Sequence, residues 1–182
     1  RWDRCRATLH FTAMNAAEDR TPPAPDRGAR RRAVLARLGE GVLVLPAATL
    51  ALASRDTEHP YVADRELFWL TGLTEPGSVA VLAAGAEPRL TVFALERDPE
   101  AELWAGPRLG VDGVGEASGA DEALPRSALA GHLPELLGGS DRIHFRLGGA
   151  DEEVERHVIG ALRHARDRGG RTGRGPRGVV DP

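Results

Sequence analysis

Aromatic side chains in two charged stretches of the chain are the residues best suited to recognise a ligand. Tyr61 and Trp69 lie in the stretch 55–76, and Trp104 lies in the stretch 102–110. An aromatic face packs well against an apolar ring, and recognition residues are often carried on loops. Trp104 is flanked by charged residues, glycine and proline. Two placements of its side chain are therefore equally compatible with the sequence: exposure for recognition, and packing over an edge of the sheet. Trp69 lies in an apolar run and is predicted to belong to the core.

Histidine and acidic side chains form two weaker candidate metal sites. Glu153, His157 and His164 occur at helical spacing, which a zinc or manganese site could use. Polar residues on the exposed face of an amphipathic helix show the same spacing, and this interpretation is favoured. Asp56, Glu58 and His59 form a local cluster of oxygen and nitrogen ligands, which a loop held by hydrogen bonds to Asp56 explains equally well.

Motifs that the sequence lacks, together with its cysteine content and charge, exclude several classes of function. The sequence has no Gly-x-Ser-x-Gly elbow, and with no lysine it has no Walker-type phosphate loop. The single cysteine, Cys5, excludes an internal disulfide framework and suits a cytoplasmic location. The formal charge of −3 gives no reason to expect a nucleic-acid partner. No apolar run is long enough to predict a membrane span.

Strands alternate with helices along the chain, which predicts an α/β fold with a mixed β-sheet flanked by helices. The most distinct signal is a β-hairpin formed by 78–84 and 90–95, because a loop with glycine and proline separates the two runs. Asp26, Asp64 and Ser127 are predicted helix N-caps. The other expected elements are helices at 26–38, 64–70, 127–137 and 151–168, one helical turn at 99–104, strands at 42–45, 123–124 and 142–147, a strand or loop at 50–53, and a weak helix or loop at 110–119.

The two ends of the chain are predicted to lie outside the folded domain. Residues 1–27 are polar and rich in proline and are expected to form a disordered leader. Residues 1–13 precede the only methionine, Met14, and are interpreted as upstream sequence or as a true tail. Residues 28–168 form the predicted domain, and 169–182, rich in glycine, arginine and proline, form a predicted linker to a further domain.

Two long motifs follow one another in the sequence. The first, RDTEHPYVADRELFWLTGLTEPGSVAVL, covers residues 55–82. The second, ERDPEAELWAGPRLGVDGVGEASGADEALP, covers residues 96–125. In this order they resemble the N-terminal domain of the Xaa-Pro aminopeptidase (aminopeptidase P) and prolidase family, and aminopeptidase P is the favoured member. The resemblance extends over residues 31–182 and includes the closing VVDP.

The resemblance implies an enzyme of two domains. The N-terminal domain of the family is a mixed sheet flanked by helices. The catalytic "pita-bread" domain binds two divalent metal ions, usually Mn(II), which activate a water for attack on the bond before proline. No positions of this chain match that domain, so it supplies no catalytic residue and no metal ligand. The chain alone is therefore expected to be inactive and to bind no metal.

The resemblance also implies roles for individual residues. Trp104 matches a tryptophan that faces a substrate pocket, often the pocket of a neighbouring subunit. Asp56 matches an acidic residue near the domain junction, and Tyr61 in the same stretch is the third candidate substrate-binding residue. This stretch departs from the family pattern at His59, at 62–63 and at 65–66.

The sequence therefore predicts the non-catalytic N-terminal domain of a manganese-dependent Xaa-Pro aminopeptidase. Such a domain shapes the pocket for an Xaa-Pro peptide and builds a homo-oligomer, either a dimer or a tetramer. The expected location is the cytoplasm, with neither nucleic acid nor membrane as a partner. The alternatives are the N-terminal domain of a prolidase, a stand-alone peptide-binding module derived from the family, and a small independent enzyme that binds metal through His157 and His164 or through Asp56 and His59.

Overall fold

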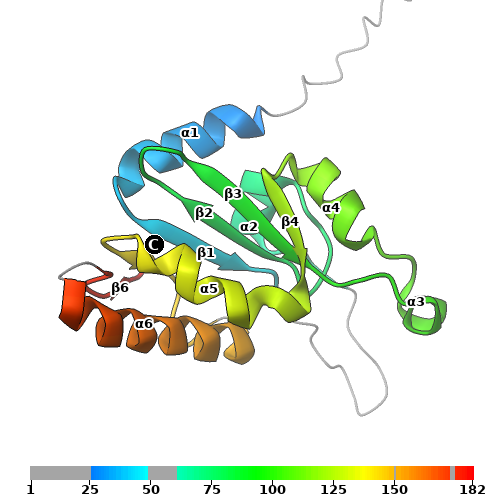
Figure 1. Cartoon of the computed structure of the whole chain (residues 1–182). Coiled ribbons are helices and arrows are strands. Elements are labelled where there is room, and N and C mark those ends of the chain that lie inside the picture. The colour runs from blue at the N-terminus through cyan, green and yellow to red at the C-terminus, as the bar shows by residue number, and fades with distance from the viewer. Residues whose placement is uncertain (1–25, 49–60, 150, 173–174) are drawn as a thin grey trace, which may run out of the picture.

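A mixed six-stranded sheet with helices on both faces organises the chain (Figure 1). The computed structural model describes residues 26–48, 61–149, 151–172 and 175–182. The spatial order of the strands is β4-β3-β2-β1-β5-β6. Their bounds are β1 (Val42–Pro46), β2 (Val79–Ala83), β3 (Arg89–Ala94), β4 (Glu122–Pro125), β5 (Ile143–His144) and β6 (Val179–Val180). The pairs β1–β2 and β2–β3 are antiparallel, whereas β3–β4, β1–β5 and β5–β6 are parallel. The predicted α/β fold with a mixed sheet is thus confirmed.

Helices cover both faces of the sheet, which explains why its central strands are continuous apolar runs. Alternate residues of β1 point to opposite sides: Val42 and Val44 join one core cluster, and Leu43 and Leu45 join the other. The first cluster is completed by α5 (Leu129–Gly138) and α6 (Glu152–Thr172). The second is completed by α1 (Arg27–Leu38), α2 (Arg65–Thr71) and α4 (Gly110–Ser118). A further helix, α3 (Pro99–Ala105), stands apart from both layers (Figure 1).

Local signals in the sequence place most of these elements correctly. The predicted hairpin is β2–β3. The side chain of Asp26 caps α1 by accepting from Ala29 N at 2.9 Å, and the side chain of Asp64 caps α2. The weak signal at 110–119 is the helix α4, which ends at Gly119 in a left-handed conformation (φ 60°).

Three predictions are wrong at places where contacts between distant segments determine the secondary structure. Ser127 caps no helix, because it lies within a 3₁₀ turn (Arg126–Ala128) that precedes α5. The strand predicted at 142–147 is limited to Ile143–His144, since its parallel neighbour β6 pairs with only these two residues. Composition at 169–182 predicts only a linker, yet α6 continues to Thr172 and Val179–Val180 pair with β5. The predictions for 1–25 and for 50–53 fall outside the described residues.

Candidate functional site

The helix α2, in the first motif, is fixed at both ends by local hydrogen bonds. At its start the Asp64 carboxylate accepts from Glu66 N at 3.0 Å and from Leu67 N at 2.8 Å. At its end Gly72 adopts a left-handed conformation (φ 77°), and its N–H donates to Phe68 O at 2.7 Å. Leu67, Leu70 and Thr71 face the core. The helix therefore holds its outward residues in a defined place.

The prediction that Trp69 belongs to the core is wrong, because this residue is 44% exposed. Leu67, Leu70 and Thr71 occupy the inward stripe at helical spacing, which turns Trp69 toward solvent. The guanidinium of Arg30 on α1 lies 4.9 Å from the centroid of the Trp69 ring. Arg30 Nη1 also donates to Trp69 O at 3.0 Å, so this exposed tryptophan is oriented by two contacts from α1.

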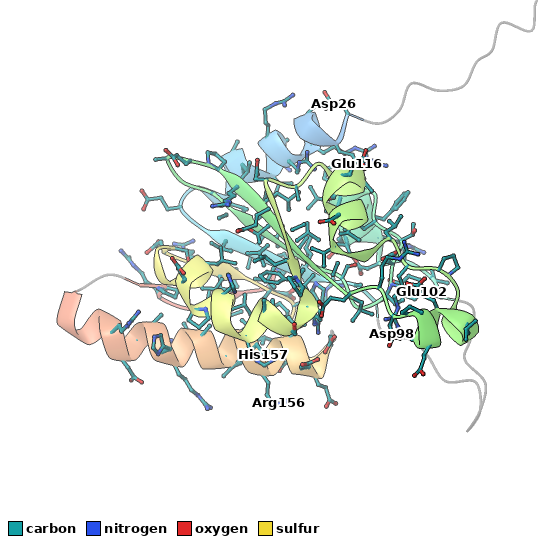
Figure 2. All side chains as sticks on the ribbon, turned by 45° about the vertical axis from the view of Figure 1, so that its right-hand side comes forward. Asp26, Asp98, Glu102, Glu116, Arg156 and His157 are labelled. Carbon is teal, nitrogen blue, oxygen red and sulfur yellow. The ribbon has the colours of Figure 1, made fainter. Side chains whose placement is uncertain are left out.

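The helix α3, in the second motif, is short but strongly capped. Its N-cap, Asp98, accepts from Glu100 N at 3.0 Å and from Ala101 N at 3.2 Å. Arg97 and Glu102 form a two-point ion pair, with nitrogen–oxygen distances of 3.4 and 3.3 Å. The hydrogen bond from Arg97 lowers the pKa of the Glu102 carboxyl, which is therefore ionised at neutral pH. Figure 2 shows Asp98 and Glu102 together at this projecting helix.

This helix carries the motif tryptophan away from the sheet. The backbone of Trp104 lies in the last turn of α3, and its side chain is outside the described part of the structure. Its neighbour Leu103 is 81% exposed. A helix that is capped at its first turn and exposes a large apolar side chain is suited to contact another molecule or domain.

The structure joins the two motifs that are separate in the sequence. Leu109 N, just after α3, donates to Glu75 Oε1 in the turn that follows α2. Arg108 Nη1 donates to Glu96 O at 3.4 Å and closes the loop that holds α3. Gly110 has a φ of 71°, and a Cβ there would lie 2.7 Å from Arg97 Cγ, so the backbone passes close to the ion pair. The two motifs therefore form one connected region.

Tyr61 lies at the entrance to α2. Its hydroxyl is buried, and none of the residues that the structure describes gives it a hydrogen bond. Burial raises the pKa of Tyr61, and the negative charge of Asp64 raises it further. Asp56 lies outside the described residues. The substrate-binding roles of Tyr61, Asp56 and Trp104 remain predictions.

No metal centre is formed by the described residues. Within 26–48, 61–149, 151–172 and 175–182, no three His, Cys, Asp or Glu side chains lie together as potential ligands. His157 instead pairs with Glu153 on the same helix, Nε2 to Oε1 at 3.5 Å, and lies on α6 as Figure 2 shows. This part of the chain does not fit a two-metal centre, and His59 with Asp56 lies beyond it. Among the residues that the structure describes, no helix is both long and apolar enough to cross a membrane.

Sequence comparison decides the family to which this region belongs. The family model "Aminopeptidase P, N-terminal domain" matches residues 28–144, which include both motifs, α2 and α3. The chain belongs to the aminopeptidase P N-terminal domain family. The resemblance in the two motifs is thereby confirmed.

Two relatives of this aminopeptidase P domain are both much longer than the chain. It is 34% identical over 122 residues to the Xaa-Pro aminopeptidase of Escherichia coli, a match that covers 65% of this chain and 28% of that protein. It is 35% identical over 126 residues to Xaa-Pro aminopeptidase 1 of Streptomyces coelicolor, covering 63% of this chain and 26% of that protein. The chain thus spans little more than a quarter of these relatives.

Solved structures give the same result for the fold. The aminopeptidase PepP of Pseudomonas aeruginosa matches 87% of this chain and 36% of its own, with a TM-score of 0.75 and 36% identity. The Zn-substituted aminopeptidase P of E. coli, solved in complex with product, matches with a TM-score of 0.76 and 30% identity and covers 85% of this chain and 36% of that one. The mixed sheet with its flanking helices is therefore the fold of the aminopeptidase P N-terminal domain.

Proposed function

We propose that this chain is the non-catalytic N-terminal domain of a cytoplasmic, manganese-dependent Xaa-Pro aminopeptidase, and that it shapes the pocket for the peptide. One observation carries the proposal: the motif that contains Trp104 is held on a capped helix that projects from the sheet. We place the chemistry in a catalytic domain elsewhere, because the match to this chain covers only 28% of the E. coli Xaa-Pro aminopeptidase and 36% of the P. aeruginosa structure. The two metal ions would polarise the scissile carbonyl and supply the attacking hydroxide there.

The helix α3 would place Trp104 against the substrate. The side chain of tryptophan combines a large apolar face with an N–H donor, and the ring of a prolyl residue matches such a face. The caps at Asp98 and the Arg97–Glu102 ion pair keep the helix ordered before substrate binds. Such preorganisation reduces the entropy that is lost on binding. The exposure of Leu103 supports a site completed by another subunit, as in the homo-oligomer that we propose, a dimer or tetramer.

Steady-state kinetics of the enzyme that carries this domain would test the role of Trp104. We expect Trp104→Ala to lower kcat/KM for an Ala-Pro-Ala peptide about tenfold or more, because an aromatic anchor that contacts the ligand typically costs more than about 1.4 kcal/mol when truncated. Trp104→Phe should retain most of the activity. Arg156→Ala, an exposed change on α6, is the matched control. Unchanged kinetics for Trp104→Ala, with the control also unchanged, would refute the role.

A further inference from the structure

An apolar groove of about 580 Å³ opens beside the exposed tryptophan of α2. We name it the α1–α2 groove. Its floor is formed by Leu43 and Leu45 of β1, and its walls include Val34 and Leu38 of α1 and Trp69 and Leu70 of α2. On the opposite face of the sheet, the corresponding side chains of β1 and β5 are covered by α5 and α6. The groove therefore leaves apolar side chains uncovered on one face of the sheet, whereas α5 and α6 cover the other face.

The wall of this groove is held by contacts to α1 and to the core. Trp69 keeps 44% of its surface exposed although Arg30 both stacks on its ring and bonds to its carbonyl oxygen. Leu43, Leu45 and Leu70 are less than a tenth exposed and belong to the core cluster of that face. A preformed apolar surface of this size is typical of a binding site.

Basic side chains surround the apolar floor. Arg37 of α1 and Arg65 of α2 line the rim, and neither forms an ion pair with any residue of the described ranges. The rim carboxylate, Glu66, is already paired with Arg146. Burial, together with the positive charge of Arg142, lowers the pKa of His144 on the floor, so its imidazole is neutral at neutral pH. The rim is thus positive in a chain whose formal charge is −3, which favours an occupant with carboxylates at its edges.

We infer that the α1–α2 groove docks an apolar segment with flanking acidic side chains, supplied by the catalytic domain of the same enzyme. The inference rests on the proposed function for the existence of that domain. Pro182 forms part of the groove wall, so a segment joined to it lies within reach at high effective concentration. The aminopeptidase structure from P. aeruginosa extends well beyond the part that this chain matches, which covers 36% of it. The relatives therefore contain further residues, beyond the matched part, that could fill the groove.

Binding of the fluorescent dye 1-anilinonaphthalene-8-sulfonate, an apolar anion, tests the chemistry of the groove. We expect the chain of 182 residues to bind the dye. Trp69→Ala, and separately the double variant Arg37→Glu/Arg65→Glu, should each weaken binding about tenfold, because they remove an aromatic wall or reverse the rim charge. The double variant Arg166→Glu/Arg168→Glu makes the same charge change at exposed positions of α6 that do not line the groove, and it should leave binding unchanged. Circular dichroism of every variant verifies that it is folded.

The same titration on the enzyme that carries this domain tests the occupant. We expect the dye to be excluded, and Arg37→Glu/Arg65→Glu to lower the thermal midpoint of the enzyme and to admit the dye. An enzyme that cleaves Xaa-Pro peptides but binds the dye as well as the chain does would overturn the docking proposal and leave the proposed function intact. Self-association of the chain that the rim variant abolishes would also overturn it, in favour of a second copy. Exclusion of the dye without Xaa-Pro hydrolysis would support the docking and contradict the proposed function.

Discussion

Removal of the Arg126 guanidinium should destabilise the domain strongly, because this one group joins three elements. Arg126 Nη1 donates to Gly77 O, before β2, at 3.0 Å. Arg126 Nη2 donates to Asp151 Oδ2 at 2.9 Å, and the other oxygen of Asp151 accepts from Glu153 N at 2.9 Å at the start of α6. The Arg126 side chain is 12% exposed and that of Asp151 is 21% exposed. The guanidinium thus connects the sheet, the 3₁₀ turn and the N-terminus of α6.

The size of the effect follows from these exposures. Breaking a fully buried ion pair by removing one partner costs about 3–5 kcal/mol. Water reaches part of both side chains here, so we expect Arg126→Met to lower the free energy of unfolding by about 2 kcal/mol. Methionine retains the apolar stem, so the loss reports the charged group rather than packing. That loss is a large part of a typical domain stability of about 5–15 kcal/mol.

Urea unfolding, followed by circular dichroism, measures this loss. A double-mutant cycle with Asp151→Asn should give a coupling energy of about 1–2 kcal/mol, since the two side chains are in direct contact. Glu153→Gln is the matched control, because Glu153 is 58% exposed and 3.4 Å from Arg126, and it should cost less than about 0.5 kcal/mol. If Arg126→Met unfolds within about 0.5 kcal/mol of the parent chain, or the coupling energy is zero, the role assigned to this network is wrong.

The remaining predictions concern ionisation. Tyr61 is the only tyrosine of the chain, so the ultraviolet absorbance of tyrosinate reports its titration alone. We expect the pKa of Tyr61 to lie above the ordinary value of 10.0. Asp64→Asn should lower this pKa, because it removes a neighbouring negative charge. The stabilisation that accompanies this raised pKa is present below pH 10 and is lost as the pH rises through the pKa of Tyr61 in the folded protein. A measured pKa of 10.0 or lower would contradict the burial of the hydroxyl. The pKa of Glu102 lies below its ordinary value of 4.5, so its pairing with Arg97 should persist at neutral pH and be lost only as pH falls through the lowered value, which carboxyl NMR shifts can follow. Arg97→Gln should raise the pKa of Glu102 toward its ordinary value, because the hydrogen bond from Arg97 is the largest cause of the lowering. An unshifted titration in the parent chain would refute the ion pair.

Local sequence signals were sufficient for much of the fold. The hairpin β2–β3 needs only two apolar runs and a turn between them. Asp26 and Asp64 cap their helices through residues two or three positions further on, and so the pattern is complete within one helical turn. Apolar residues at helical spacing likewise placed α6, whose buried stripe includes Val154 and Val158.

Contacts between distant segments decided the rest. Val179–Val180 form β6 only because β5 offers them backbone partners: Phe145 N donates to Val180 O at 3.0 Å. An apolar run around Trp69 does not show which side of a short helix faces the sheet. Turning the helix by the angle between two successive residues would change whether Trp69 is buried or exposed. The α1–α2 groove requires α1, α2, β1 and β5 together, so no single stretch of sequence could indicate it.

The same helix, α2, connects the two surfaces for which we propose a function. Its outward residue Trp69 forms a wall of the α1–α2 groove, and the turn after it supplies Glu75, which accepts from Leu109 N behind α3. Because Leu67 and Leu70 anchor α2 in the core, it cannot shift at one surface without moving backbone that contacts the other. Docking in the groove would therefore fix the position from which α3 presents Trp104. In this arrangement the domain would align the tryptophan that we propose to face the substrate with the proposed catalytic domain, through one short, doubly capped helix.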